Sequence, residues 1–284
     1  SSGGGTGSNT SGSGTSGSSG TGSSSTGSTG GTSGGCQVPG TGEGSDYFSA
    51  ARTLPLNSST ISVQVANLNG DCFSDFLVLT IDSVEVFLGD GVGLTHTASF
   101  PLPGIGVQGS VMAVADLDGD GLDDVVLQLH TVLGYALSDG DGGLVSYTPF
   151  ATSASYGELA AGDFNEDGRA DVVFAPGPVP NVTTTTMVLY LSGPAGLTPA
   201  GTLVVGSNPL RPAVGDFNGD GHLDLMVAEY YSTGDSHVFL GQGDGGFVAH
   251  NINLNTLLAY PPLAADLDGD GKLDLLGGRP GPVI

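Results

Sequence analysis

Short apolar runs separated by turn residues fill the chain from about residue 45 onward. Ile61–Val65, Val111–Ala115 and Val125–Gln128 are examples, each four or five residues long and rich in β-branched side chains. Runs of this length and composition are typical of strands. No stretch shows a convincing amphipathic period of 3.6 residues, so we expect an all-β fold.

A nine-residue acidic loop follows one such run in each of five segments. The loops begin at residues 67, 116, 163, 216 and 266, so successive starts lie 49, 47, 53 and 50 residues apart. A second signature, a strand end with a Gly-rich turn, recurs 21 to 28 residues after each of the first four starts. A repeat of about fifty residues with several short strands has the size of one β-propeller blade.

The loops place oxygen ligands at alternate positions, which suits Ca²⁺. This ion takes six to eight oxygens at about 2.3–2.6 Å. Positions 1, 3, 5 and 9 offer side-chain oxygens, position 7 offers a carbonyl, and Gly at position 6 permits the sharp turn. We expect up to five Ca²⁺ ions. The predicted ligands are Asn67, Asn69, Asp71, Phe73, Asp75, Asp116, Asp118, Asp120, Leu122, Asp124, Asp163, Asn165, Asp167, Arg169, Asp171, Asp216, Asn218, Asp220, His222, Asp224, Asp266, Asp268, Asp270, Lys272 and Asp274.

Other metal motifs fit less well. An EF-hand needs Glu at loop position 12 and flanking helices, and position 12 holds Val, Leu, Phe or Gly here. Dockerin-type loops continue into a helix, and nonapeptide β-rolls repeat every nine residues. Zinc prefers Cys and His, which do not recur at ligand positions. Ordinary solvated turns are the plainer reading of one such loop, but five copies in register favour calcium.

The five loops are unequal in acidity. The ligand positions hold two, four, three, three and four Asp residues along the chain, and loop one has Cys72 where the others have Gly. A Cβ strains a left-handed turn, so we expect Asn67–Asp75 to be the weakest site or an empty one. Five bound Ca²⁺ would change the formal charge from −24 to −14.

Composition sets the remaining limits. Residues 1–44 are mostly Ser, Gly and Thr and predict a disordered tether, which leaves 45–284 for the repeats. Only five Lys and Arg accompany 29 Asp and Glu, which argues against nucleic acid and anionic membranes as partners. No apolar run is long enough to span a bilayer. Cys36 and Cys72 could form one disulfide or remain two thiols.

The acidic loops at this period resemble the FG-GAP/VCBS repeats, including those of integrin α-chain propellers. The resemblance covers about residues 45–284. It implies four-stranded blades, calcium in the hairpin between the first two strands of each blade, and usually seven blades. Five loops are visible, and the chain stops at Ile284 within the fifth unit. A five-bladed ring or an incomplete seven-bladed ring would fit, and we favour the incomplete ring, truncated at the C-terminus.

The resemblance and the tether together predict an extracellular or cell-surface protein, of bacterial type, that acts as a binding, adhesion or display module. The expected ligand is an extracellular protein or carbohydrate, and a lipid or covalent anchor could precede the tether. A propeller scaffold of a secreted lyase or hydrolase, and a purely structural array, are the alternatives. The one Gly-x-Ser-x-Gly match, residues 31–35, lies in the tether without the strand and helix a nucleophile elbow needs. We therefore expect no catalytic residues.

Overall fold

The computed structural model describes residues 54, 56, 58–102, 111–153, 155–177, 185–206, 209–229, 235–253, 263–267 and 273–276. Within these residues the regular structure is all strand, which confirms the predicted fold class. The strands are β1 (Thr60–Ala66), β2 (Asp75–Thr80), β3 (Ser83–Gly89), β4 (Leu94–Pro101), β5 (Val111–Ala115), β6 (Asp124–Leu129), β7 (Val132–Ala136), β8 (Thr148–Thr152), β9 (Gly157–Gly162), β10 (Asp171–Pro176), β11 (Thr186–Leu191), β12 (Thr198–Val204), β13 (Ala213–Gly215), β14 (Asp224–Ala228), β15 (Asp235–Gly241), β16 (Phe247–Asn253), β17 (Leu263–Ala265) and β18 (Asp274–Leu276).

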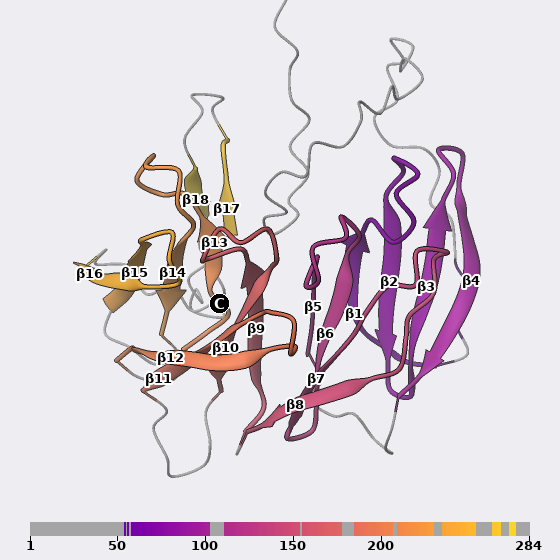
Figure 1. Cartoon of the computed structure of the whole chain (residues 1–284), viewed down its shortest axis with the longest axis horizontal. Helices are drawn as coiled ribbons and strands as arrows, with labels where there is room; N and C mark the ends of the chain where they lie inside the picture. Colours follow the sequence, from indigo (N-terminus) through magenta and orange to yellow (C-terminus); the bar gives the residue numbers. More distant parts are fainter. Residues whose placement is uncertain are drawn as a thin grey trace, which may run out of the picture.

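The strands form successive antiparallel sheets that follow one another along the chain (Figure 1). Four sheets have four strands each, in the orders β1-β2-β3-β4, β5-β6-β7-β8, β9-β10-β11-β12 and β13-β14-β15-β16, and β17 pairs with β18. We call these sheets blades one to five. The first strand of each blade lies beside the first strand of the next. This is the blade arrangement of a β-propeller. The predicted tether, 1–44, lies outside the described residues, and the number of blades stays a prediction.

Burial decreases from the second strand of a blade to the fourth. Every residue of β6 and β14 is buried, whereas most residues of β4 and β12 are exposed or half-buried. A strand covered on both faces needs apolar side chains in both directions, so it reads as a continuous apolar run. The run Val125–Gln128 is therefore explained by blades packing against both faces of β6.

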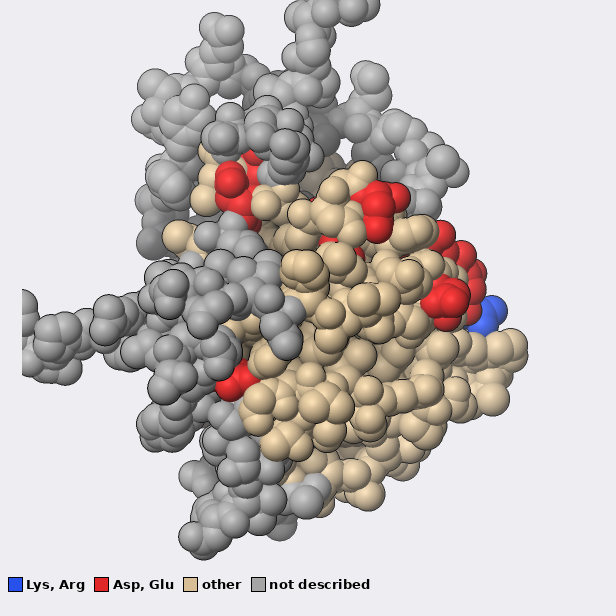
Figure 2. Space-filling view, turned by 90° about the vertical axis from the view of Figure 1, so that its left-hand side faces the viewer, with Lys and Arg blue, Asp and Glu red and all other residues tan. Residues whose placement is uncertain are grey.

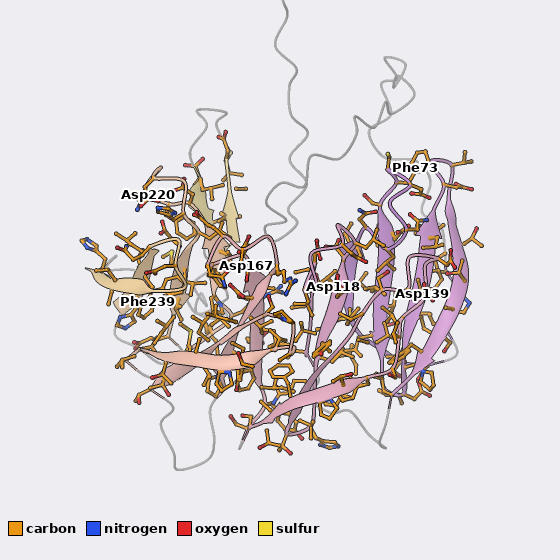
Figure 3. All side chains as sticks on the ribbon, in the orientation of Figure 1. Phe73, Asp118, Asp139, Asp167, Asp220 and Phe239 are labelled. Atoms are coloured by element: carbon orange, nitrogen blue, oxygen red, sulfur yellow. The ribbon has the colours of Figure 1, made fainter. Side chains whose placement is uncertain are left out.

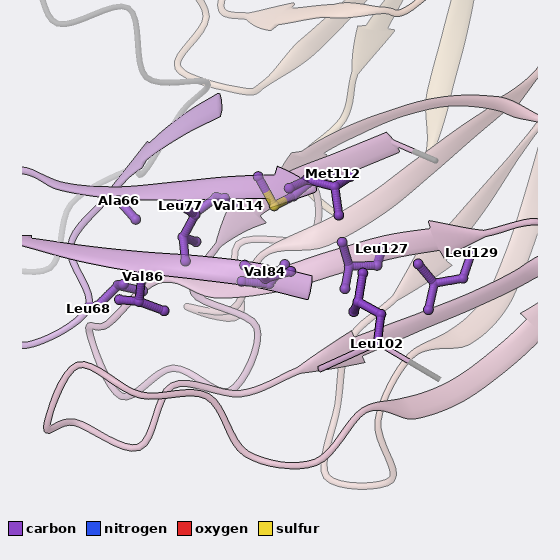
Figure 4. Close-up of a cluster of buried hydrophobic side chains, with 12 residues drawn as sticks. Ala66, Leu68, Leu77, Val84, Val86, Leu102, Met112, Val114, Leu127 and Leu129 are labelled. Carbon is purple, nitrogen blue, oxygen red and sulfur yellow. The ribbon is translucent and has the colours of Figure 1, made fainter. Parts of the chain in front are cut away.

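Apolar side chains fill the space between neighbouring blades. Between blades one and two they form a cluster that includes Leu77 and Val84 from blade one and Met112 and Leu127 from blade two (Figure 4). Each fully buried side chain of this kind contributes roughly 1.5–3 kcal/mol. Leu68, at position 2 of loop one, is fully buried in the same cluster. The core between the blades thus fixes the acidic loop.

Candidate metal centre

The acidic loops connect the first two strands of their blades, as the resemblance implied. Loops one to four join β1 to β2, β5 to β6, β9 to β10 and β13 to β14. Phe73, Asp118, Asp167 and Asp220 represent them in Figure 3 and lie toward the upper side of the ribbon. Most carboxylates visible in Figure 2 also gather in the upper half of that view. The loops therefore share one face of the blades.

Loop five joins β17 to β18 and is described only in part. Its first predicted ligand, Asp266, directly follows β17, and its last, Asp274, is the first residue of β18. The backbone N–H of Leu267 donates to Asp274 Oδ2 at 3.0 Å. Asp268, Asp270 and Lys272 lie outside the described residues, so their predicted role stays a prediction.

Loop two brings three carboxylates together. Ligand atoms of Asp116, Asp118 and Asp120 all lie within 4.8 Å of one another. Backbone N–H groups hold the carboxylates in place, since those of Gly119 and Gly121 donate to the two oxygens of Asp116 at 2.7 and 2.8 Å. The chain wraps around a point on which these side chains converge.

Loop four repeats this wrapping with one amide in place of a carboxylate. Asp216 accepts N–H groups from Gly219 and Gly221 at 2.6 and 2.9 Å. Asn218 Oδ1 accepts the N–H of Asp220 at 2.7 Å, and its Nδ2 donates to the Asp220 carboxylate at 2.8 Å. Loop three is similar, since Asn165 and Asp167 pair at 3.1 and 3.2 Å and Asp163 accepts the N–H of Gly168 at 2.9 Å. The second N–H that Asp163 accepts comes from Asp167, at 3.1 Å.

Position 6 adopts the left-handed backbone that the sequence predicted. The φ angles are 87° at Gly121, 86° at Gly168 and 92° at Gly221. Cys72 occupies the same position in loop one with φ of 75°, a conformation that costs free energy for a residue with a Cβ. Cys72 is disulfide-bonded. Cys36, the other cysteine of the chain, lies outside the described residues.

The Asp at position 9 has a structural role that sequence reasoning missed. Asp75, Asp124, Asp171 and Asp224 are at most 1% exposed. One oxygen of each accepts the N–H of loop position 2 at 2.8 to 3.0 Å. The other accepts an N–H from the end of the third strand at 2.7 to 3.0 Å. Each carboxylate thus joins its loop to the third strand.

One signal in the sequence points to this role. The strand-end signature recurs in step with the loops, and the residues that donate from it are Gly89, Ser138, Ser192 and Gly241. An ionised carboxylate has about four acceptor sites, so two N–H groups leave capacity for an ion. Coordination of calcium by position 9 stays a prediction.

Burial makes these carboxylates hard to ionise in the absence of a cation. It raises the pKa of Asp124 to about 7 and that of Asp171 to about 6. The two N–H groups lower each pKa but do not compensate for burial. Burial, followed by the charge of Asp120, also raises the pKa of Asp118. A bound cation would favour the ionised form of all three groups.

Side chains at position 7 contact the preceding loop. The sequence assigned this position only a carbonyl role. The structure places the Arg169 side chain over Gly119 of loop two. His222 Nδ1 lies 2.5 Å from Glu166 Oε1 of loop three. Neighbouring loops are therefore in direct contact.

Position 8 also connects neighbouring loops. The Asp123 N–H donates to the Asn67 carbonyl at 2.8 Å, and the Asn67 N–H donates to Asp123 Oδ2 at 2.8 Å. The Ala170 N–H donates to the Asp116 carbonyl at 2.6 Å. These bonds between neighbouring loops were not predicted from the sequence.

The donor set fits a hard cation. Positions 1, 3 and 5 of the described loops carry only carboxylate and amide oxygens, which Ca²⁺ prefers to nitrogen and sulfur ligands. In loop two, Asp116, Asp118 and Asp120 would hold the ion, and the carbonyl of Leu122 and the carboxylate of Asp124 are the further predicted ligands.

Comparisons with known proteins agree with the repeat structure. The model of the FG-GAP-like repeat matches residues 67–127 and 216–277. A lectin of Agrocybe aegerita has a similar structure, with a TM-score of 0.57, 18% identity and coverage of 76% of this chain. This chain spans 60% of the lectin's length. The biofilm matrix protein Bap1 of V. cholerae has a TM-score of 0.45 and 23% identity, with coverage of 77% and 35% of the two chains.

No curated protein has a matching sequence. Among the described residues there is no helix with the length and hydropathy needed to cross a membrane. The likeness to the lectin shows the fold, and the family model identifies the repeat. Residues 67–127 and 216–277 therefore match FG-GAP-like repeats, and the described strands fold as blades of the β-propeller type.

Proposed function

We propose that this chain is a calcium-stabilised extracellular propeller that acts as a binding or display module. The carboxylate cluster of loop two, Asp116, Asp118 and Asp120, is the observation that carries the proposal. Two like charges 4 Å apart repel by about 1 kcal/mol in bulk water and about 4 kcal/mol at an effective dielectric constant of 20. A divalent cation would convert this repulsion into attraction.

The repetition of the loop supports the same role. The wrapping seen in loop two recurs in loops three and four, and the buried position-9 Asp recurs in loops one to four. A formal charge of −24 repels itself in a compact chain. Ions bound on the loop face would reduce that charge where it is densest.

The disulfide at Cys72 supports an extracellular location. Disulfides form and persist in oxidising compartments such as the cell exterior. Extracellular calcium modules have dissociation constants of about 10⁻⁴–10⁻³ M, so loops of modest affinity would be loaded there. The proposed ligand is an extracellular carbohydrate or protein. The Agrocybe aegerita lectin recognises non-reducing terminal N-acetylglucosamine, which makes this sugar one probe to include.

A thermal melt after EDTA treatment tests the calcium role. The wild-type chain is melted alone, with millimolar Ca²⁺ and with equal Mg²⁺, and far-UV circular dichroism checks folding in each sample. We expect a Ca²⁺-specific rise in Tm, since each ion at 100 times its Kd stabilises the native state by about 2.7 kcal/mol. A folded chain whose Tm is the same in EDTA and Ca²⁺ would contradict the proposal.

A further inference from the structure

A cavity of about 180 Å³ lies between blades two and three, beside loop two. Its lining comes from loop two, from β7, from loop three and from the turn after β11, residues 192–197. All of the lining residues are among those that the structure describes. The cavity lies at the interface between blades two and three. A comparison of this interface with those between blades one and two and between blades three and four explains its origin.

The turn after the third strand normally packs on a leucine of the preceding blade. Gly142 lies in the turn after β7 of blade two. A Cβ added to Gly142 would lie 2.5 Å from Leu88 Cδ1, so this turn covers Leu88 of blade one. A Cβ on Gly245 would likewise lie 3.2 Å from Leu191 Cδ1, so the turn of blade four covers Leu191. Both leucines directly precede the strand-end residue that donates to a position-9 Asp.

The equivalent leucine between blades two and three, Leu137, is not met by a glycine of the following turn. Leu137 precedes Ser138 in the same way, yet the glycine of the blade-three turn, Gly196, meets the Tyr135 hydroxyl instead, 2.8 Å from the position of its Cβ. This turn has the sequence Gly193-Pro-Ala-Gly196, closed by a hydrogen bond from the Gly196 N–H to the Gly193 carbonyl at 2.8 Å. Leu137 consequently lines the cavity.

The chemistry of the lining is amphipathic and balanced in charge. Leu117, Leu137 and Leu197 supply apolar surface, while Asp118 and Arg169 carry one negative and one positive charge. The Tyr135 ring and hydroxyl and the Ser192 hydroxyl add an aromatic face and two neutral polar groups. Ligand sites typically combine a mostly apolar wall with a few polar groups that fix orientation.

We infer that this cavity binds one neutral sugar ring. A single ring suits the volume, which is below the roughly 300–1,000 Å³ of pockets for drug-sized ligands. The lining carries one carboxylate and one guanidinium and so has no excess charge to attract an ion. Because Asp118 is also a proposed calcium ligand, Arg169 and the hydroxyls of Tyr135 and Ser192 are the groups left to bind sugar hydroxyls. The aromatic face of Tyr135 suits the C–H face of a pyranose. The inference rests on the proposed binding function and names its site and ligand class.

Ligand-observed NMR with free monosaccharides tests the site. The full chain in millimolar Ca²⁺ is mixed separately with D-glucose, D-galactose, D-mannose and N-acetyl-D-glucosamine. Saturation transfer and a titration give binding and Kd. We expect at least one of these sugars to bind.

The decisive variant is Gly193→Leu, and Gly201→Leu is its matched control. A Cβ at either glycine meets no atom within 4 Å, so both positions accept a side chain, but only Gly193 lines the cavity. We expect Gly193→Leu to weaken sugar binding at least tenfold and Gly201→Leu to leave it unchanged. Tyr135→Phe, which keeps the ring, should weaken binding severalfold and serves if Gly193→Leu does not fold.

Two results would overturn the inference. One is the absence of binding by all four sugars, and the other is equal binding by wild type and both cavity variants. The Ca²⁺-induced rise in Tm is measured on the same samples. If that rise is present while sugars do not bind, the sugar site fails and the calcium role stands. If the rise in Tm is absent, the calcium role is contradicted, whatever the result of the sugar titration.

Discussion

Loops one and two have nearly the same backbone but differ in charge. Both place a left-handed residue at position 6, Cys72 in one and Gly121 in the other, and both end in a buried Asp that accepts two N–H groups. In loop two the carboxylates at positions 1, 3 and 5 lie close together. In loop one positions 1 and 3 are amides, and Asp71 at position 5 is the one acid of the three.

The difference separates two functions of one motif. The position-9 Asp organises the blade whether or not an ion binds, because its partners are backbone groups of the same blade. Positions 1, 3 and 5 set the affinity for a cation, because more carboxylates mean stronger binding. Loop one therefore shows that the wrapping survives when the charge is reduced.

Removal of the position-9 carboxylate should have the largest effect, and it should be alike in both loops. Asp124→Ala and Asp75→Ala each leave two buried N–H groups without acceptors, at about 1–3 kcal/mol each. We expect a loss of about 2 kcal/mol or more in the free energy of unfolding, measured by urea denaturation in EDTA. Asp141→Ala, at an exposed site, is the control and should change stability by about 0.5 kcal/mol or less. A large loss for Asp124→Ala alone would break the comparison.

Position 5 should matter in loop two only when calcium is present. Asp120→Asn keeps an oxygen that can accept the Leu122 N–H but removes a charge from the cluster. We expect it to remove most of one ion's contribution, about 2.7 kcal/mol at 100 times Kd, and to leave stability in EDTA unchanged or slightly higher. Melts of wild type and variant in Ca²⁺ and in EDTA measure this, and equal losses in both would assign Asp120 a purely structural role.

The stability of the metal-free protein should fall as pH rises. Burial raises the pKa of Asp124 to about 7 and that of Asp171 to about 6, so the native state binds more protons than the unfolded state above pH 4. The free energy of unfolding therefore decreases from pH 4 toward 7, by at most about 1.4 kcal/mol per pH unit for each carboxyl. Melts in EDTA across this range measure the trend, and Ca²⁺ should reverse it. A rise in metal-free stability over this range would show that the carboxylates are readily ionised.

Addition of a carboxylate to loop one should have the smallest effect. Asn69→Asp makes position 3 of loop one acidic, as Asp118 does in loop two. We expect calcium affinity at loop one to increase by less than tenfold, or less than about 1.4 kcal/mol, because position 1 remains Asn67. Calcium titration calorimetry compares this variant with wild type. Asp118→Asn, which gives loop two the position-3 residue of loops three and four, is the reciprocal variant and should weaken binding by a similar factor.

The sequence predicted the strands and loops because their patterns are local. The run Val111–Ala115 became β5 with the same bounds, and position 6 is left-handed in loops two to four, where Gly predicted it. The pairing of Asp124 with Ser138 was not predicted, because it joins two signatures that were treated as separate. The cavity beside Leu137 was also beyond prediction, since it depends on which atom a turn meets in the neighbouring blade.

The number of bound calcium ions tests the central claim most directly. Equilibrium dialysis against Ca²⁺, with metal analysis of the folded protein, counts the ions in wild type, in Asp120→Asn and in Asp71→Asn of loop one. We predict that Asp120→Asn lowers the count by about one and that Asp71→Asn changes it little, because loop one contributes least. A folded wild-type chain that retains no calcium, or a count that Asp120→Asn leaves unchanged, would contradict the account.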